Sequence, residues 1–206
     1  MATKSELTQQ LGVVVGFDDP QADLEQYRTP PELAAHLVHT ADLQGDIDGR
    51  DVVDLGCGTG MLALGAALRG PRRVVGVDVD PDPLATAREN ERRVGSASSV
   101  SWMRANATRE PLSPDGETTV VMNPPFGAQA GSEHADRAFL AVTARIAGVS
   151  YSIHNADSAD FVEAFAGDNG GDVTHAFRAE FGLPRQFEFH HDDSRTLDAE
   201  VFRIEW

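Results

Sequence analysis

The stretch DVVDLGCGTG, residues 51–60, decides the fold of this 206-residue chain. Its first half is an apolar run typical of a buried strand. Its second half places Gly56, Gly58 and Gly60 in a turn before the helix-like run MLALGAALRG. Glycine admits positive φ and lets a ligand come close to the backbone. A ligand in such a turn would lie at a helix N-terminus, at the carboxyl edge of a sheet.

Strand-like and helix-like patterns alternate from this turn to about residue 165. Such alternation predicts a parallel sheet with helices on both faces. Two closing segments read as strands with no helix between them, which predicts an antiparallel partner at one edge. The expected fold class is therefore α/β, a Rossmann-like, doubly wound, seven-stranded, mostly parallel sheet with an antiparallel C-terminal strand. The expected strands are residues 51–56, 73–80, 99–104, 118–123, 149–154, 172–181 and 198–206.

The segment before this core begins a helix at Pro30 and Pro31, in TPPELAAHLVHTADL. We find no repeat, no low-complexity linker and no composition shift. The sequence therefore predicts one domain over residues 1–206, with an N-terminal helical segment at 1–45 and the Rossmann-like core at 50–206.

The composition is that of a globular protein with a net charge of −16 and a single lysine, Lys4. Acidic residues are dispersed, which favours a protein that works in high salt, as in a halophilic archaeon. The longest apolar run near the N-terminus, Leu11 to Val15, is too short for a signal peptide core or a membrane span. A single cysteine, Cys57, excludes an internal disulfide. We expect a cytoplasmic protein with no membrane partner.

The acid before the glycine turn indicates which ligand the turn would hold. The run is D-x-G-x-G-x-G rather than G-x-G-x-x-G, and Asp54 would repel a phosphate but suits a cation. The second strand ends in Asp78, where an acid usually meets ribose hydroxyls. These features favour S-adenosylmethionine as cofactor. The alternative is a structural turn with Asp54 and Asp78 as surface carboxylates.

The fourth expected strand runs into Asn-Pro-Pro-Phe, residues 123–126. It should lie beside the first strand, so that Asn123 emerges next to the cofactor. An exocyclic amine needs orientation because its lone pair is delocalised into the ring. The Asn123 Oδ1 and the Pro124 carbonyl could each accept one N–H, proline would stiffen the loop, and Phe126 would stack on the base. The alternative is a proline-rich strand terminator with a core phenylalanine.

These motifs together resemble class I S-adenosylmethionine-dependent methyltransferases of the N6-adenine branch. The sequence is most similar to the archaeal and eukaryotic methyltransferase-like protein five group, which methylates adenine in small-subunit rRNA. LEQYRTPPELAA, DLGCGTGML, NPPFG, DRAFL, YSIH and LPRQFEFH carry the likeness across most of the chain. Arg28, where familiar members have proline, and Asn106, where an acid is more usual, depart from the pattern.

The resemblance implies a role for each matching position. The N-terminal segment would gate the cofactor through Gln26 and Thr29, and Tyr27 would stack on the cofactor or pack beneath the helix. Asn123, Pro124, Pro125 and Phe126 would be catalytic. The full cofactor-binding set is Gln26, Tyr27, Thr29, Asp54, Gly56, Thr59, Gly60, Met61, Asp78, Asn106, Ala107 and Asn123.

The resemblance also implies partners, namely small-subunit rRNA and a small zinc-containing activator. The expected sheet order makes residues 99–104 an edge strand, with Val100 and Trp102 as an exposed apolar edge that a partner strand would cover. The activator is expected near Val100–Arg104. No metal site is expected in this chain, because His190 to Asp193 read as a solvated loop, and His154 either supports the site or ends a strand.

Two other functions compete with adenine methylation. A planar glutamine amide in a protein such as a release factor suits the same clamp, although that branch usually has tyrosine where this chain has Phe126. A catalytically silent cofactor-binding ribosome assembly factor is the second alternative.

Overall fold

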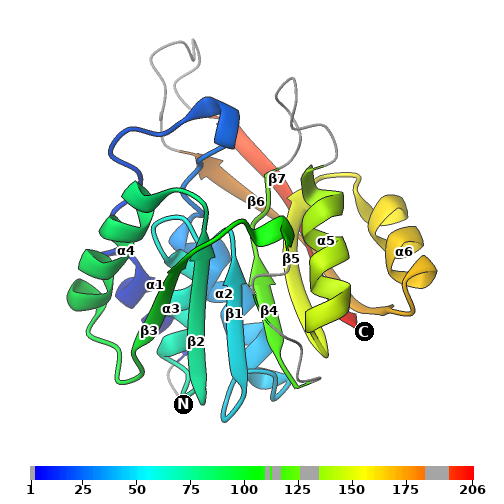
Figure 1. Ribbon diagram of the computed structural model, residues 1–206, viewed down its shortest axis with the longest axis horizontal. Coiled ribbons are helices and arrows are strands. Elements are labelled where there is room, and N and C mark those ends of the chain that lie inside the picture. Colours follow the sequence, from blue (N-terminus) through cyan, green and yellow to red (C-terminus); the bar gives the residue numbers. More distant parts are fainter. Residues whose placement is uncertain (1–2, 110–111, 113–116, 126–134, 184–194) are drawn as a thin grey trace.

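The structure, a computed structural model, describes residues 3–109, 112, 117–125, 135–183 and 195–206. One seven-stranded sheet has the order β3-β2-β1-β4-β5-β7-β6 (Figure 1). β1 to β5 are parallel, and β7 runs antiparallel to both neighbours. The predicted fold class is therefore confirmed. The strands are β1 (Asp51–Leu55), β2 (Arg73–Asp78), β3 (Val100–Arg104), β4 (Thr119–Met122), β5 (Val149–Asn155), β6 (Asp172–Leu183) and β7 (Arg195–Glu205).

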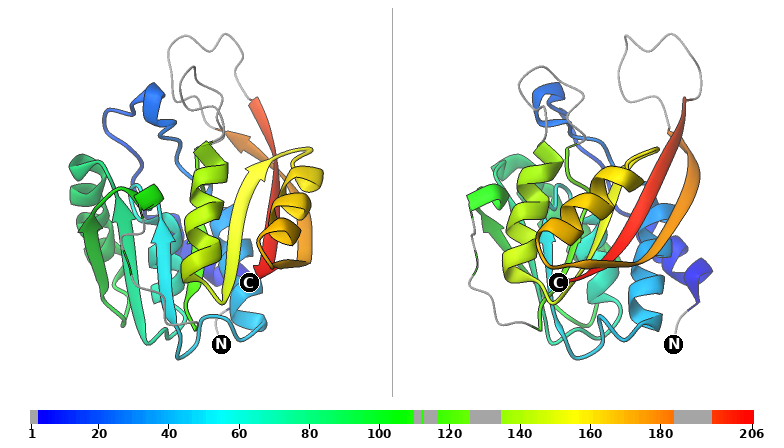
Figure 2. Two further views of the ribbon diagram at one scale, coloured as in Figure 1. Left: turned by 45° about the vertical axis from the view of Figure 1, so that its right-hand side comes forward. Right: turned by 90° about the vertical axis from the view of Figure 1, so that its right-hand side faces the viewer.

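Helices cover both faces of the sheet, as Figure 2 shows for α1 and α2 on one side and α5 and α6 on the other. The first face carries α1 (Lys4–Leu11), α2 (Pro31–Leu43), α3 (Met61–Ala67) and α4 (Pro81–Val94). The second face carries α5 (Ala135–Ile146) and α6 (Ala159–Asp168). Two short 3-10 turns, η1 (Ala22–Leu24) and η2 (Ala107–Arg109), lie at the carboxyl edge. None of the described helices is long and apolar enough to cross a bilayer.

The central strand β1 is buried along its whole length, which explains its apolar run. Val52 packs into the core beneath α1 to α3, whereas Val53 and Leu55 pack into the core on the α5 side. Alternate side chains therefore enter different cores. This places the carboxyl end of β1, and the glycine turn after it, at the centre of the sheet.

The N-terminal helix α1 has a signal that our sequence analysis did not use. Thr3 accepts a hydrogen bond from the Glu6 backbone N–H at 3.2 Å, and the Glu6 carboxylate accepts one from the Thr3 N–H at 2.7 Å. This reciprocal capping box satisfies two backbone donors that a helix start leaves free. The T-x-x-E pattern was readable in the sequence.

Strand β3 is the sheet edge, as expected, but Val100 is buried and Trp102 and Met103 are half-buried rather than exposed. Val100 is 8% exposed. Trp102 covers Gly76, where an added Cβ would come within 2.6 Å of the indole, and its Nε1 donates to Glu91 Oε2 at 2.8 Å. The expected exposed apolar edge is therefore corrected. Helix α4 covers the Trp102 indole, and Gly76 leaves room for it because it has no side chain. A partner strand would therefore pair with the backbone edge of β3.

Candidate active site

The glycine turn has the backbone conformation that its sequence predicts. Gly56, Gly58 and Gly60 have φ values of +73°, +50° and +92°, which L side chains rarely adopt. An added Cβ on Gly58 would stand 2.8 Å from the Phe17 ring. The Gly58 N–H donates to Asp78 Oδ2 at 2.8 Å, which joins the turn to the end of β2.

A cavity of about 430 Å³ opens between this turn and the segment that contains η1. Its lining residues come from the carboxyl ends of β1, β2 and β4 and from the segment with η1. Figure 2 shows η1 above these strand ends. Sequence-distant residues meet there as the doubly wound topology requires. The residues that line it are Phe17, Asp23, Leu24, Glu25, Gln26, Tyr27, Arg28, Thr29, Gly56, Cys57, Gly58, Thr59, Met61, Asp78, Val79, Asn106, Ala107, Asn123, Pro125, Ala135 and Phe139.

Most of the residues predicted for the site line this cavity. They are Gln26, Tyr27, Thr29, Gly56, Thr59, Met61, Asp78, Asn106, Ala107, Asn123 and Pro125. Asp54, Gly60 and Pro124 lie behind the lining. Gly60 is instead the N-cap of α3, and Asp54 is 1% exposed beneath the turn. Phe126 lies outside the described residues.

Two carboxyl groups lie on the β1–β2 side of the cavity. Asp54 Oδ2 accepts a hydrogen bond from the Ala63 N–H at 2.8 Å, while its buried Oδ1 has no partner among the described residues. Burial, supported by the nearby Asp78, raises the pKa of Asp54 to about 7. Burial likewise raises the pKa of Asp78. A cation in the cavity would relieve both effects, which is the ligand charge that the sequence predicts.

Asn123 follows β4 and projects into the same cavity. Its Nδ2 donates to Thr29 Oγ1 at 3.0 Å, which fixes the orientation of the amide. Its Oδ1 is buried and has no partner among the described residues. A buried acceptor without a donor is costly, by about 1–3 kcal/mol. The amide therefore presents a fixed acceptor to whatever fills the cavity.

The segment from η1 to α2 is attached at two points around the cavity. Gln26 Nε2 donates to Asp80 Oδ2 at 2.8 Å, on the β2 side. Thr29 accepts from Asn123, on the β4 side. Between these bonds and η1 lies Glu25, which is 8% exposed and has a φ of +49°. A non-glycine residue in this region is uncommon and marks a constrained segment.

Sequence reasoning missed several cavity residues that come from other elements. Phe17 reaches the glycine turn from the loop after α1, and Phe139 lies against Gly56, where an added Cβ would be 3.1 Å from its ring. Phe139 belongs to the core on the α5 side, and only the fold shows that this core ends at the cavity. For Phe17 the sequence holds no signal that we recognise.

His154 ends β5 close to this edge and is buried, with 1% exposure. Its Nε2 lies 2.9 Å from Ser152 Oγ, and its Nδ1 lies 3.9 Å from Asp136 Oδ2 at the start of α5. Burial lowers the pKa of His154 to about 4, so the ring is neutral at pH 7. It does not line the cavity. No group of three or more potential metal ligands comes together in the described ranges, and His190 to Asp193 lie outside them.

The comparisons with known proteins agree with this geometry. Residues 33–146 match the methyltransferase small domain family. The rRNA N6-adenosine-methyltransferase Mettl5 of Drosophila melanogaster is 32% identical, over 97% of this chain and 95% of its own length. An uncharacterized protein of Methanocaldococcus jannaschii is 35% identical, over 100% of this chain and 95% of its own length.

A solved structure extends the likeness to three dimensions. The crystal structure of a candidate RNA methyltransferase from Pyrococcus horikoshii is 36% identical, and the match covers 100% of this chain and 98% of that chain with a TM-score of 0.88. The chain thus belongs to the methyltransferase small domain family, in the branch of the METTL5 proteins.

Proposed function

We propose that this protein is an S-adenosylmethionine-dependent methyltransferase that acts on the N6 amine of an adenosine in small-subunit rRNA. The observation that carries the proposal is the Asn123 amide, held by Thr29, with its Oδ1 buried and unpartnered at the cavity. Family membership supports the same conclusion, because the Drosophila relative bears the name of this activity.

The cavity fits the cofactor in shape and in charge. Three positive-φ glycines let the ligand approach the backbone of the turn, and Asp54 and Asp78 supply the negative charge that a cation needs. Bound there, the cofactor would supply an electrophilic methyl group on a sulfonium. We assign Asp78 to the ribose hydroxyls and Asn106 and Ala107 to the adenine ring. Gln26, Tyr27 and Thr29 would close over them.

The target amine would be held by the loop after β4. Asn123 Oδ1 and the Pro124 carbonyl would each accept one N–H, so that the nitrogen lone pair faces the methyl group. The cofactor would supply the methyl group to this nitrogen and would leave as S-adenosylhomocysteine, and the proton released by the amine would pass to water. This is catalysis by orientation and by preorganised acceptors. Stacking of the base on Phe126 remains part of the proposal.

The direct test combines the purified protein and isotope-labelled S-adenosylmethionine with small-subunit rRNA in one reaction and with a release factor in a parallel one. Mass spectrometry of the digested nucleosides should show labelled N6-methyladenosine, and Asn123→Ala should slow its formation by roughly 10²–10³-fold. Label in the N5 amide of a release-factor glutamine, with none in RNA, would instead establish protein methylation. Cofactor binding with no transfer to either substrate would favour the assembly-factor role.

We further propose that a small zinc-containing activator adds a strand to β3. This strand is the sheet edge, and the Val100 N–H on it donates to Glu91 Oε1 rather than to another strand. Because backbone groups alternate sides along a strand, those of Trp102 and Arg104 are expected to face the same outer side. Affinity purification from cells should recover the activator, and Trp102→Pro, with folding verified by circular dichroism, should release it. Purification as a fully active monomer would contradict this proposal. We also propose that the protein acts in the cytoplasm, together with its rRNA substrate.

A further inference from the structure

The arginines of this acidic protein differ in whether a carboxylate neutralises them. Within the described ranges, ion pairs are formed by Arg69, Arg72, Arg73, Arg93, Arg178 and Arg203. Arg104 and Arg109 are exposed, and neither forms an ion pair with any residue in the described ranges. In a chain with 33 acidic and 17 basic residues, an exposed arginine without a carboxylate is a place where an external anion can bind.

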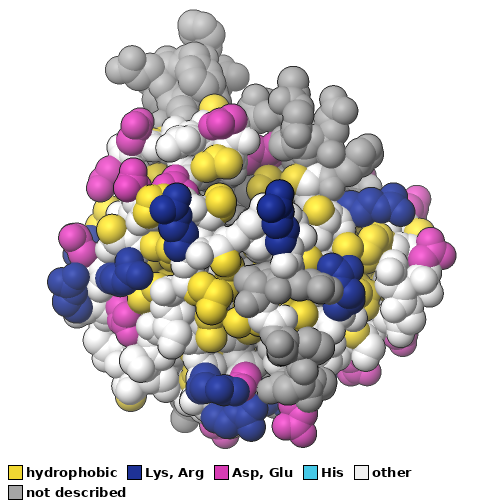
Figure 3. All heavy atoms as spheres, in the orientation of Figure 1, with side chains coloured by type: hydrophobic (Ala, Val, Ile, Leu, Met, Phe, Trp, Pro, Cys, Tyr) yellow, Lys and Arg dark blue, Asp and Glu magenta, His cyan; other side chains and the backbone are white. Residues whose placement is uncertain are grey.

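These two arginines bracket one wall of the cavity. Arg104 ends β3, and its Nε donates to the Val79 carbonyl at 3.2 Å. Arg109 ends η2. Asn106 and Ala107, which lie between them in sequence, line the cavity. In Figure 3, Lys and Arg side chains stand around the apolar centre of the face that carries β3 and η2.

The backbone between the two arginines is held in place by its own hydrogen bonds. Asn106 Oδ1 accepts from the Thr108 N–H at 2.9 Å, and the Arg109 N–H donates to the Asn106 carbonyl at 3.1 Å. The Ala105 N–H donates to the Asp78 carbonyl at 2.9 Å. An anion that binds both arginines therefore orders little additional backbone.

The charges that line the cavity have the opposite sign to those of Arg104 and Arg109. Asp23, Glu25 and Asp78 line the cavity and would repel a phosphate. A nucleotide can therefore enter only with its base, while its phosphates stay outside. Arg104 and Arg109 are exposed outside this lining, and Arg104 bonds the carbonyl of Val79, which is a lining residue.

We propose that Arg104 and Arg109 bind RNA backbone phosphates next to the target adenosine, an inference that rests on the proposed function. A guanidinium presents paired donors that match phosphate oxygens, so the contact retains hydrogen bonds when salt screens its Coulomb part. The strand addition proposed at β3 uses backbone groups, whereas the phosphate contacts use these two side chains.

The test measures RNA binding for Arg104→Gln, Arg109→Gln and the double variant, with S-adenosylhomocysteine bound. The probe is a labelled small-subunit rRNA fragment, and its affinity is measured at several KCl concentrations from about 0.1 M to about 1 M. Circular dichroism at each salt concentration verifies that the protein is folded. Each substitution should weaken binding roughly fivefold near 0.1 M salt and reduce the slope of log K against log salt by about 0.7. Arg92→Gln is the matched control, since Arg92 is also exposed, lies near the C-terminus of α4, and donates to the Arg88 backbone carbonyl without an ion pair to any described residue.

Each outcome decides the inference separately from the proposed function. If the double variant methylates RNA with its RNA affinity and salt slope unchanged, that result would overturn the phosphate contacts and leave the proposed function intact. Weaker RNA binding in both arginine variants, but not in Arg92→Gln, would support them even if no N6-methyladenosine formed. An equal loss of RNA affinity in Arg92→Gln would indicate a general charge effect and would overturn the inference. The inference would also be overturned if the arginine variants lost a protein partner while their RNA affinity stayed unchanged.

Discussion

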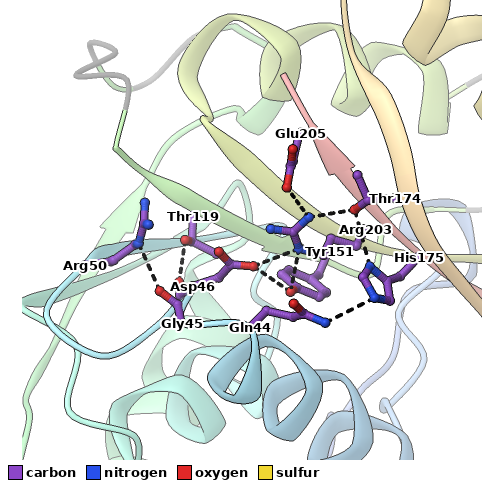
Figure 4. A network of polar contacts seen from close by, with 10 residues as sticks. All are labelled: Gln44, Gly45, Asp46, Arg50, Thr119, Tyr151, Thr174, His175, Arg203 and Glu205. Carbon is purple, nitrogen blue, oxygen red and sulfur yellow. Dashed lines mark hydrogen bonds and ion pairs between the residues drawn. The ribbon is translucent and has the colours of Figure 1, made fainter.

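Buried polar residues occur toward both ends of the sheet, in two clusters that differ in how they are satisfied. Beneath α2, toward the amino ends of β4 and β5, Asp46 Oδ2 accepts from Tyr151 Oη at 2.7 Å and from Arg203 Nε at 2.8 Å (Figure 4). Arg203 Nη1 donates onward to Thr174 and Glu205, each at 2.6 Å. At the carboxyl edge, by contrast, Asn123 Oδ1 and Asp54 Oδ1 are buried without a partner.

This difference separates a structural cluster from a functional one. A buried network whose members all have partners specifies the fold and has no capacity left for a ligand. Buried acceptors without donors beside a cavity are incomplete until something binds. Both clusters join residues that are distant in sequence, and burial alone would not tell them apart.

The largest effect is expected from breaking the satisfied cluster. Asp46→Ala leaves the Arg203 guanidinium, with 9% side-chain exposure, without its buried carboxylate and should cost about 3–5 kcal/mol of unfolding free energy. Denaturant unfolding measures this, and Asp46→Asn should cost less because it retains an acceptor. Cofactor affinity of the folded fraction should be unchanged. A stable Asp46→Ala protein that no longer binds cofactor would reverse the assignment of the two clusters.

Breaking the incomplete cluster should instead reduce catalysis. Asn123→Ala removes the acceptor offered to the amine and should lower kcat by roughly 10²–10³-fold. Its melting temperature should not fall, since an unsatisfied buried acceptor is also removed. Asn155→Ala, an exposed amide at the end of β5, is the control. A kcat within twofold of the unsubstituted protein would exclude Asn123 from the chemistry.

The acids of the incomplete cluster should make cofactor binding depend on pH. The pKa of Asp54 is about 7 in the folded protein, above the ordinary value that it has in the unfolded chain. The protonated carboxyl therefore stabilises the fold fully below the unfolded-state pKa, and this stabilisation is lost as pH rises through 7. A cationic cofactor prefers the ionised carboxylate, so its binding should be roughly fivefold weaker at pH 6 than at pH 7. Calorimetry in buffers of different ionisation enthalpy should detect proton release, and Asp54→Asn should remove the dependence. A flat pH profile in the unsubstituted protein would contradict this role for Asp54.

The smallest effect concerns the bond that orients the amide. Thr29→Val keeps the shape but removes the oxygen that Asn123 Nδ2 donates to, which is worth about 1 kcal/mol, or roughly fivefold in kcat. Thr29→Ser should retain the activity. Steady-state kinetics with rRNA separates the two variants, and equal rates in both would show that the amide is oriented by something else.

The sequence predicted the elements near the site better than the contacts around it. Apolar runs that end in glycine or proline predicted β1, β4 and the turn, because backbone conformation there depends on the residues themselves. The alternation of strands and helices then predicted that β1 and β4 are neighbours, and with them Gly56 and Asn123.

What the sequence could not predict depends on long-range packing. Asp46 and Arg203 are 157 residues apart, and neither lies in a motif that marks it as buried. The cover of Trp102 over Gly76 arises from the register of β2 and β3. Likewise, Asp54 lies beneath the turn rather than on the cavity wall because of the direction of its side chain, and residue spacing does not determine that direction.

The central claim is that the unpartnered Asn123 acceptor is completed by the N6 amine of an rRNA adenosine. It is tested most directly in cells that lack the gene, complemented with either the unsubstituted protein or Asn123→Ala at matched abundance. Mass spectrometry of nucleosides from purified small subunits should find N6-methyladenosine restored by the first and absent with the second. Equal N6-methyladenosine in both strains, or none in either, would contradict the account.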